Sequence, residues 1–255
     1  MVIRKLFVSS IFIILAIGNN SYSFTQPLED EKILKLLING KYNKKTKYIK
    51  HDLSKDNIKK YQLENVFNFS TAIIFKKEFK QDKKLNYIVV TETRDETSDC
   101  HACAPIVGIA VFEKTGTNFK IKDKFQYVER IGTWGHAPTP QLKEIGKNNY
   151  GLIFESNYFG MGITSSSTTI IGKINNKFES LHTENTEEDN NGACGNELKV
   201  ECYSYTSKLD FMKNNEKFYP ISFTYKGTSL DNNDKAIPYN KVKKYKFLKN
   251  KYVSY

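Results

Sequence analysis

Short apolar runs separated by turn-forming residues fill the chain from about Asn65 to its C-terminus. The runs are rich in Val, Ile, Thr, Phe and Tyr, which favour strands, and Asn, Gly, Lys and Asp lie between them. This pattern predicts about eleven short strands joined as antiparallel hairpins. We therefore expect a mostly β fold whose hairpins form a propeller-like, sandwich or barrel body. The expected strands are 66–76, 85–93, 106–113, 118–128, 150–156, 163–174, 177–182, 203–212, 217–225, 243–248 and 252–255.

Several of the expected hairpin turns share one pattern, in which Asn or Gly precedes an aromatic residue. Asn175 and Asn176 precede Phe178, and Asn250 precedes Tyr252. Asn and Gly tolerate the positive φ that tight hairpin turns need. These turn regions resemble the blade-type hairpins of secreted β-propeller proteins. The resemblance bears on architecture only and assigns no family.

The first 23 residues have the organisation of a secretory signal peptide. Arg4 and Lys5 form a short basic region, an apolar run over residues 6–17 follows, and Ser21 and Ser23 supply the small residues of a cleavage site. The apolar run is shorter than the roughly 20 residues that a membrane-spanning helix needs. We therefore expect a periplasmic or secreted protein with no transmembrane segment in the mature chain.

A short helical segment is expected over residues 24–64, ahead of an all-β domain over 65–255. Pro27 and the carboxylates that follow it are typical of a helix start, and apolar residues then recur at helical spacing. Ser54 is a suitable N-cap for a second short helix. The lysine-rich stretch 41–50 between the two helices is expected to be an exposed connector.

The chain has a formal net charge of +11, which nucleic acid, an anionic membrane surface or an acidic polysaccharide could match. Only Arg4, Arg94 and Arg130 are arginine, so lysine supplies nearly all of the positive charge. Nucleic-acid readers normally use the planar fork of arginine. We therefore expect solvated lysine faces and no nucleic acid partner. The expected partner is an envelope or extracellular protein or a glycan.

The four cysteines are Cys100, Cys103, Cys194 and Cys202. A Cys-x-x-Cys pair can be a redox dithiol, half of a zinc site or a local disulfide. A redox dithiol needs a helix start to lower the thiol pKa, whereas Cys103 precedes a predicted strand. Export favours two structural disulfides. We favour the local pairs Cys100–Cys103 and Cys194–Cys202, and a bridge between the two pairs is the alternative.

Two loops rich in glycine and aromatic residues are the candidate ligand-binding region. The stretch from Gly132 onward contains the only tryptophan, Trp134, and His136 two residues later. Tyr158 and Phe159 belong to a second such loop. An aromatic ring beside polar groups is a common way to stack a sugar ring or another flat ligand. If the two loops meet, these four side chains would line one pocket. The alternative is that Trp134 plugs the end of the β core.

No catalytic motif is recognisable, so a noncatalytic binding protein is the preferred interpretation. The run 165–169 of Ser and Thr lacks the Gly-x-Ser-x-Gly elbow of a nucleophile and reads as part of a strand. The alternatives are a secreted hydrolase that uses His136 or the acidic groups Asp95, Glu96 and Asp99, and a thiol–disulfide protein that uses Cys100 and Cys103. No cofactor is expected. The acidic loops 184–191 and 231–234 could hold Ca²⁺, but neither matches a known calcium-binding spacing.

Overall fold

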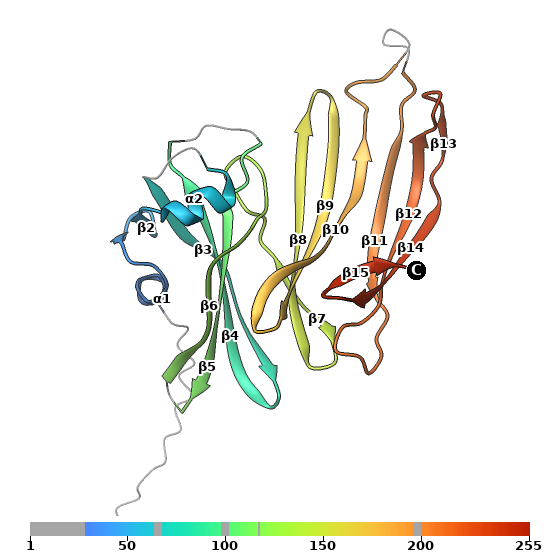
Figure 1. The fold of residues 1–255 in the computed structure, drawn as a ribbon. Helices are drawn as coiled ribbons and strands as arrows, with labels where there is room; N and C mark the ends of the chain where they lie inside the picture. The colour runs from blue at the N-terminus through green and yellow to red at the C-terminus, as the bar shows by residue number, and fades with distance from the viewer. Residues whose placement is uncertain (1–28, 64–67, 98–101, 117, 196–199) are drawn as a thin grey trace, which may run out of the picture.

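A computed structural model describes residues 29–63, 68–97, 102–116, 118–195 and 200–255. The signal peptide expected over residues 1–23 lies outside the described residues. The described part contains two short helices and two antiparallel sheets, which lie side by side with the helices on the outer side of the first sheet (Figure 1). The mostly β fold expected from the sequence is confirmed, and its form is a sandwich-like body of open sheets.

The first sheet has six strands in the order β1-β2-β3-β4-β5-β6. Its long strands form consecutive hairpins, and their register is antiparallel throughout. The strands are β1 (Lys41–Asn43), β2 (Tyr48–His51), β3 (Phe69–Gln81), β4 (Lys84–Asp95), β5 (Ile106–Thr115) and β6 (Asn118–Arg130).

The second sheet has nine strands in the order β15-β14-β12-β11-β10-β9-β8-β7, and β13 pairs with β12 beside this path. The tight turn between β9 and β10 is made by Asn175 and Asn176, which both have positive φ as expected. Lys249 and Asn250 make the same kind of turn between β14 and β15. The strands are β7 (Gln141–Gly146), β8 (Asn149–Gly160), β9 (Ile163–Ile174), β10 (Lys177–Asp189), β11 (Ser204–Phe211), β12 (Ile221–Leu230), β13 (Ala236–Pro238), β14 (Lys241–Leu248) and β15 (Lys251–Ser254).

The stretch 41–50 is largely exposed, as expected, but it is not a connector. It contains β1 and β2, which pair with each other, and β2 also pairs with β3 of the first sheet. Ile49 of β2 is fully buried among residues of helix α1 (Asp30–Leu37). The sequence did not indicate this hairpin because the lysines of the stretch occupy its exposed positions. The first sheet therefore begins before residue 65, the expected start of the β domain.

Both helices cover the outer face of the first sheet. Ile33, Leu34 and Leu37 of α1 are buried against Val89 and Phe112 of β4 and β5. Helix α2 (Lys55–Tyr61) starts at the expected cap, where the Ser54 side chain accepts a hydrogen bond from the backbone of Asn57. Neither helix in the described residues is long and apolar enough to cross a membrane.

The two sheets share an apolar core. Val90 of β4 and Ile109 of β5 are buried in one cluster with Leu152, Phe154 and Ile171 of the second sheet. The neighbouring residues on β8 and β9 pack on the opposite face, in a cluster with aromatic residues of β12 and β15. Strands buried on both faces have continuous apolar runs, which explains why Ile and Leu adjoin each other here.

A buried carboxylate on β10 joins three strands of the second sheet. Glu184 is 8% exposed and accepts hydrogen bonds from the Tyr225 hydroxyl at 2.5 Å, the Lys243 ammonium at 2.5 Å and the Tyr245 hydroxyl at 2.6 Å. The Nε2 atom of His182 lies 3.2 Å from the same carboxylate. Burial alone would raise the pKa of Glu184, but these hydrogen bonds outweigh it and lower the pKa. The group is therefore held as a carboxylate.

Candidate functional site

One face of β8, β9 and β10 changes from apolar to polar along its length. Leu152 pairs with Ile171, and both are buried against the first sheet. Further along the strands, Ser156 pairs with Ser167, and Ser167 pairs with Asn185. Side chains at alternate positions of a strand share one face, so this polar row continues the face that packs on the first sheet. The core ends where the hydroxyl groups begin.

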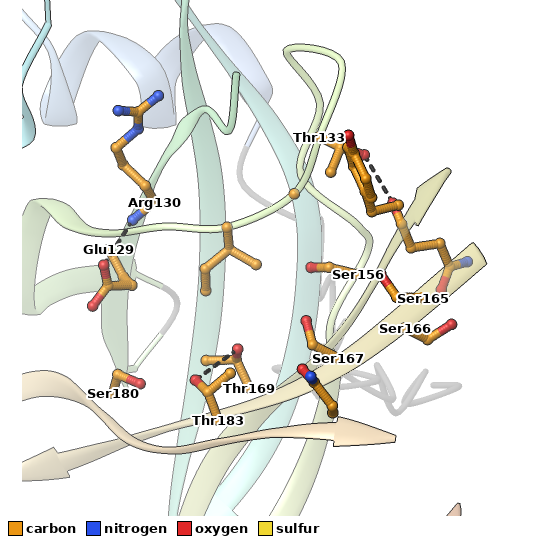
Figure 2. A pocket seen from close by; sticks show the side chains of 15 residues that line it. Glu129, Arg130, Thr133, Ser156, Ser165, Ser166, Ser167, Thr169, Ser180 and Thr183 are labelled. Carbon is orange, nitrogen blue, oxygen red and sulfur yellow. Dashed lines mark hydrogen bonds between the residues drawn. The ribbon is translucent and has the colours of Figure 1, made fainter. Parts of the chain in front are cut away.

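The polar half of this face lines a cleft of about 460 Å³ beside the end of β6, shown in Figure 2. This volume is within the range of small-molecule sites, about 300–1,000 Å³. Hydroxyl groups from three strands and from the loop after β6 predominate in the lining. The lining residues that bear a hydroxyl are Thr133, Ser156, Tyr158, Ser165, Ser166, Ser167, Thr169, Ser180 and Thr183.

The cleft carries little charge, although the protein as a whole is strongly basic. Glu129 and Arg130, both at the end of β6, are the charged residues among the described residues that line it. The Arg130 guanidinium is already used, since it donates to the backbone carbonyls of Ala104 at 3.0 Å and Tyr61 at 3.1 Å. None of the lysines in the described part of the chain lines the cleft. The surface thus suits a neutral ligand that both donates and accepts hydrogen bonds.

Trp134 lies at the tip of a tight turn beside the cleft. Its φ is +56° and that of Gly135 is +72°, and Thr133 and His136 exchange backbone hydrogen bonds across the turn. Two consecutive positive φ values are typical of a type I′ turn, which normally uses Asn-Gly or Gly-Gly. A tryptophan in this conformation is strained, and its side chain is still 50% exposed.

Several hydrogen bonds fix the position of this turn. The Gly135 amide donates to the carbonyl of Cys103 at 2.8 Å, and the Ala137 amide donates to the buried Glu92 carboxylate at 2.9 Å. The His136 Nδ1 atom is 3.5 Å from the same carboxylate. Gly132 is required because a Cβ atom there would lie 2.0 Å from the carbonyl oxygen of His136. The turn that carries Trp134 is thus fixed by its hydrogen bonds to Cys103 and Glu92.

The structure brings together the two segments that the sequence singled out, but Tyr158 and Phe159 lie in strand β8 and not in the loop expected for them. The Thr133 hydroxyl donates to the carbonyl of Asn157 at 2.9 Å, and Tyr158 lines the cleft beside Thr133. Trp134 and Phe159 are exposed next to residues that line the cleft, but they do not line it themselves. His136 is held toward Glu92 and does not line the cleft either. Of the four expected residues, Tyr158 therefore lines the cleft, and the other three do not.

One of the two local cysteine pairs favoured from spacing is a disulfide in the structure. Cys194 and Cys202 form a disulfide across a loop with a sequence separation of 8. Cys103 is also disulfide-bonded, and Cys100 lies outside the described residues. No cysteine of the described chain is a free thiol.

The alternative catalytic groups have other partners in the structure. The Glu96 carboxylate accepts a hydrogen bond from Ser70 at 2.5 Å, which lowers the pKa of Glu96, and Arg94 donates to it at 3.3 Å. Asp95 accepts hydrogen bonds from the backbone and hydroxyl of Thr97. Asp99 lies outside the described residues. The described residues that line the cleft include no histidine and no cysteine.

The two acidic stretches considered for Ca²⁺ differ from each other in structure. Residues 184–189 belong to strand β10, so the expected loop 184–191 is largely a strand, and its first carboxylate is buried. The stretch 231–234 is a turn in which Asp231 accepts hydrogen bonds from the amides of Asn233 and Lys235. Within the described residues, no group of three or more His, Cys, Asp or Glu side chains is arranged to hold a metal ion.

Sequence reasoning missed the hydroxyl rows themselves. The run from Ser165 to Thr169 was correctly assigned to a strand, but its facing partners Ser156 and Thr183 became apparent only from the register. The available signal was the abrupt change within β9 from Ser and Thr to Ile170 and Ile171. A strand that changes from polar to apolar along one face extends beyond the core it packs on.

Comparison with known proteins identifies no relative. No family model matches the chain, and neither curated proteins nor solved structures show significant similarity to it. The function must therefore be argued from the site.

Proposed function

We propose that this protein is an exported, noncatalytic binding protein whose cleft takes a neutral glycan. The observation that carries the proposal is the nearly uncharged, hydroxyl-lined cleft in a chain of net charge +11. Serine and threonine hydroxyls donate and accept hydrogen bonds, as sugar hydroxyls do. The expected signal peptide and the disulfide-bonded cysteines support export, because disulfides persist in oxidising compartments.

The aromatic residues at the rim support a glycan over other neutral polar ligands. Tyr158 is 41% exposed at the mouth of the cleft, and Trp134 is 50% exposed on the adjoining turn. The flat face of an aromatic ring provides apolar contact for the C–H face of a pyranose, while the ring edge and the neighbouring hydroxyls remain polar. A strained turn that holds a tryptophan toward solvent is a feature associated with binding sites.

The first test uses the single tryptophan as a reporter. Neutral oligosaccharides such as chitohexaose, cellohexaose and maltohexaose are titrated into the protein while the fluorescence of Trp134 is followed. We expect saturable binding of at least one of them, with the sugar recovered intact by chromatography. Absence of binding of all three, tested up to their solubility limits, would contradict the glycan proposal. Cleavage of the sugar would contradict the noncatalytic role.

Paired substitutions locate the site. Ser156→Ala combined with Ser167→Ala removes two facing hydroxyls and should weaken binding, measured by calorimetry, by about fivefold per lost hydrogen bond. Ser222→Ala combined with Thr224→Ala removes two hydroxyls from β12, outside the cleft, and should leave affinity unchanged. Equal effects of the two pairs would contradict binding in this cleft.

Trp134→Asn tests the role of the ring without disturbing the turn. Asn-Gly is the preferred sequence of a type I′ turn, so relief of strain offsets the lost contacts of the ring. We expect the free energy of unfolding to stay within about 1 kcal/mol of the parent value while glycan affinity measured by calorimetry falls. Unchanged affinity would show that the ring does not contact the ligand.

A further inference from the structure

A second surface of the molecule combines lysines with exposed aliphatic side chains. On β14 and β15 the aromatic residues Tyr245, Phe247 and Tyr252 and the hydrogen-bonded Lys243 face inward, and the outward positions are exposed. We call these outward residues the lysine–aliphatic face; they are Val242, Lys244, Lys246, Leu248, Lys251 and Val253.

Cationic and aliphatic side chains alternate across this face. The strand register pairs Lys246 with Val253 and Leu248 with Lys251. Val242 is 53% exposed, Leu248 47% and Val253 38%. Single exposed aliphatic residues are common on protein surfaces, but here they gather on two adjacent strands. The face is therefore apolar and cationic over the same area.

The charge of this face is uniformly positive. Strands β12, β14 and β15 contain no Asp or Glu. The outward residue Lys226 of β12 adds to the positive charge. On the next strand, Asp210 is engaged by Lys208 at 3.0 Å, so this carboxylate does not neutralise the face. An anionic partner would find no nearby repulsive group on these three strands.

We infer that the lysine–aliphatic face docks on the surface of an anionic phospholipid bilayer. Lysines near such a surface are attracted to the lipid headgroups, and long lysine side chains can keep their charge at the headgroups while their stems contact apolar groups. Aliphatic side chains between them can enter the boundary between headgroups and acyl chains. A dissolved polyanion would use the lysines but would leave Val242, Leu248 and Val253 in water. The aliphatic members therefore favour a bilayer over a polyanion.

The test is sedimentation of the protein with phosphatidylcholine vesicles that contain or lack phosphatidylglycerol. We expect binding to the anionic vesicles and its loss at high salt, because salt screens exposed charges. Lys244→Gln with Lys246→Gln should reduce partitioning by about 25-fold, at about fivefold per lysine. Leu248→Ser with Val253→Ser keeps the charge and should reduce partitioning by about tenfold.

A matched control separates docking from general charge. Lys44→Gln with Lys45→Gln removes two exposed lysines from the turn between β1 and β2 on the first sheet, and should leave partitioning within about twofold. Melting temperatures of all variants verify folding.

Three results would overturn the inference: no binding to anionic vesicles, equal effects of the two lysine pairs, or an aliphatic pair that leaves vesicle partitioning unchanged. Binding to heparin that matches vesicle binding in every variant would indicate a polyanion partner instead. A dimer in sedimentation velocity that Leu248→Ser with Val253→Ser dissociates, without vesicle binding, would indicate that the face meets a second copy.

Discussion

Replacement of Glu184 by Gln tests whether the buried carboxylate holds the second sheet together. The substitution keeps the size and shape of the side chain but removes its charge. Glu184 lies on β10, which contributes to the cleft, and its partners Lys243 and Tyr245 lie on β14, which carries the lysine–aliphatic face. The experiment therefore measures how much this carboxylate stabilises the strands that carry the two proposed functional surfaces.

The expected loss of stability follows from three hydrogen bonds. In the parent protein, the hydroxyls of Tyr225 and Tyr245 and the ammonium of Lys243 all donate to a charged acceptor within 2.6 Å. A hydrogen bond to a charged group contributes about 1 kcal/mol more than a neutral one. Lys243 is 35% exposed and can recover some hydration, so its share is smaller. We expect a loss of about 2–3 kcal/mol in the free energy of unfolding.

Urea unfolding followed by far-ultraviolet circular dichroism measures this loss, and the melting temperature should fall by about 5–10 °C. Asp210→Asn is the matched control, because Asp210 is also ion-paired with a lysine, at 3.0 Å, but is 50% exposed. An exposed ion pair contributes little, so the control should lose at most about 0.5 kcal/mol. Equal losses in the two variants would refute the reasoning.

The same variant has a predicted pH dependence. The pKa of Glu184 is lowered in the folded protein from its ordinary value of 4.5, so the carboxylate stabilises the fold fully above pH 4.5. This contribution is lost as the pH falls through the folded pKa and the group takes up a proton. The difference in stability between the parent protein and Glu184→Gln should therefore shrink below pH 4.5. A difference that stays constant down to pH 3 would show that lost charge is not the cause.

Two further predictions concern other parts of the fold. Cys194→Ser with Cys202→Ser should lower the free energy of unfolding by about 2–3 kcal/mol, as expected for a short closed loop; chemical denaturation measures it, and an unchanged midpoint would contradict a structural role. Burial lowers the pKa of His51 and His182 below the ordinary 6.5 in the folded protein. Both side chains therefore bind protons more readily in the unfolded protein. Stability should therefore decline as the pH falls below 6.5, and His182→Phe should reduce that decline if the assignment is right.

The sequence predicted the fold class well because strand and turn signals are local. The turns at Asn175-Asn176 and Lys249-Asn250 have the positive φ values expected of them. The sequence failed where local chemistry resembled a loop, as in β1 and β2, whose lysines occupy exposed positions of a hairpin. The hairpin places its residues in the first sheet through the pairing of β2 with β3, which lies further along the sequence. The pattern of residues 41–51 alone does not indicate that this hairpin joins a larger sheet.

The candidate site was predictable only in part, for a similar reason. Glycine and aromatic residues marked the turn at Trp134 and the end of β8 near Tyr158, and this turn contacts β8 through Thr133 and Asn157. The cavity itself is formed by serines and threonines that are unremarkable in sequence. Their arrangement in rows depends on the register of β8, β9 and β10, which is a property of long-range pairing.

The hydroxyl rows also explain why the sandwich opens where it does. Continuing the contact between the sheets past Phe154 and Ile171 would bury the hydroxyls of Ser156 and Ser167 against apolar side chains. Burying a hydroxyl without a partner costs more than the added apolar contact returns, so close packing of the two sheets stops at this row. The hydroxyls of Thr169 and Thr183 lie closer to the core, where they form a hydrogen bond with each other at 3.1 Å. A change of side-chain chemistry along three strands thus creates both the boundary of the core and a polar cleft beside it.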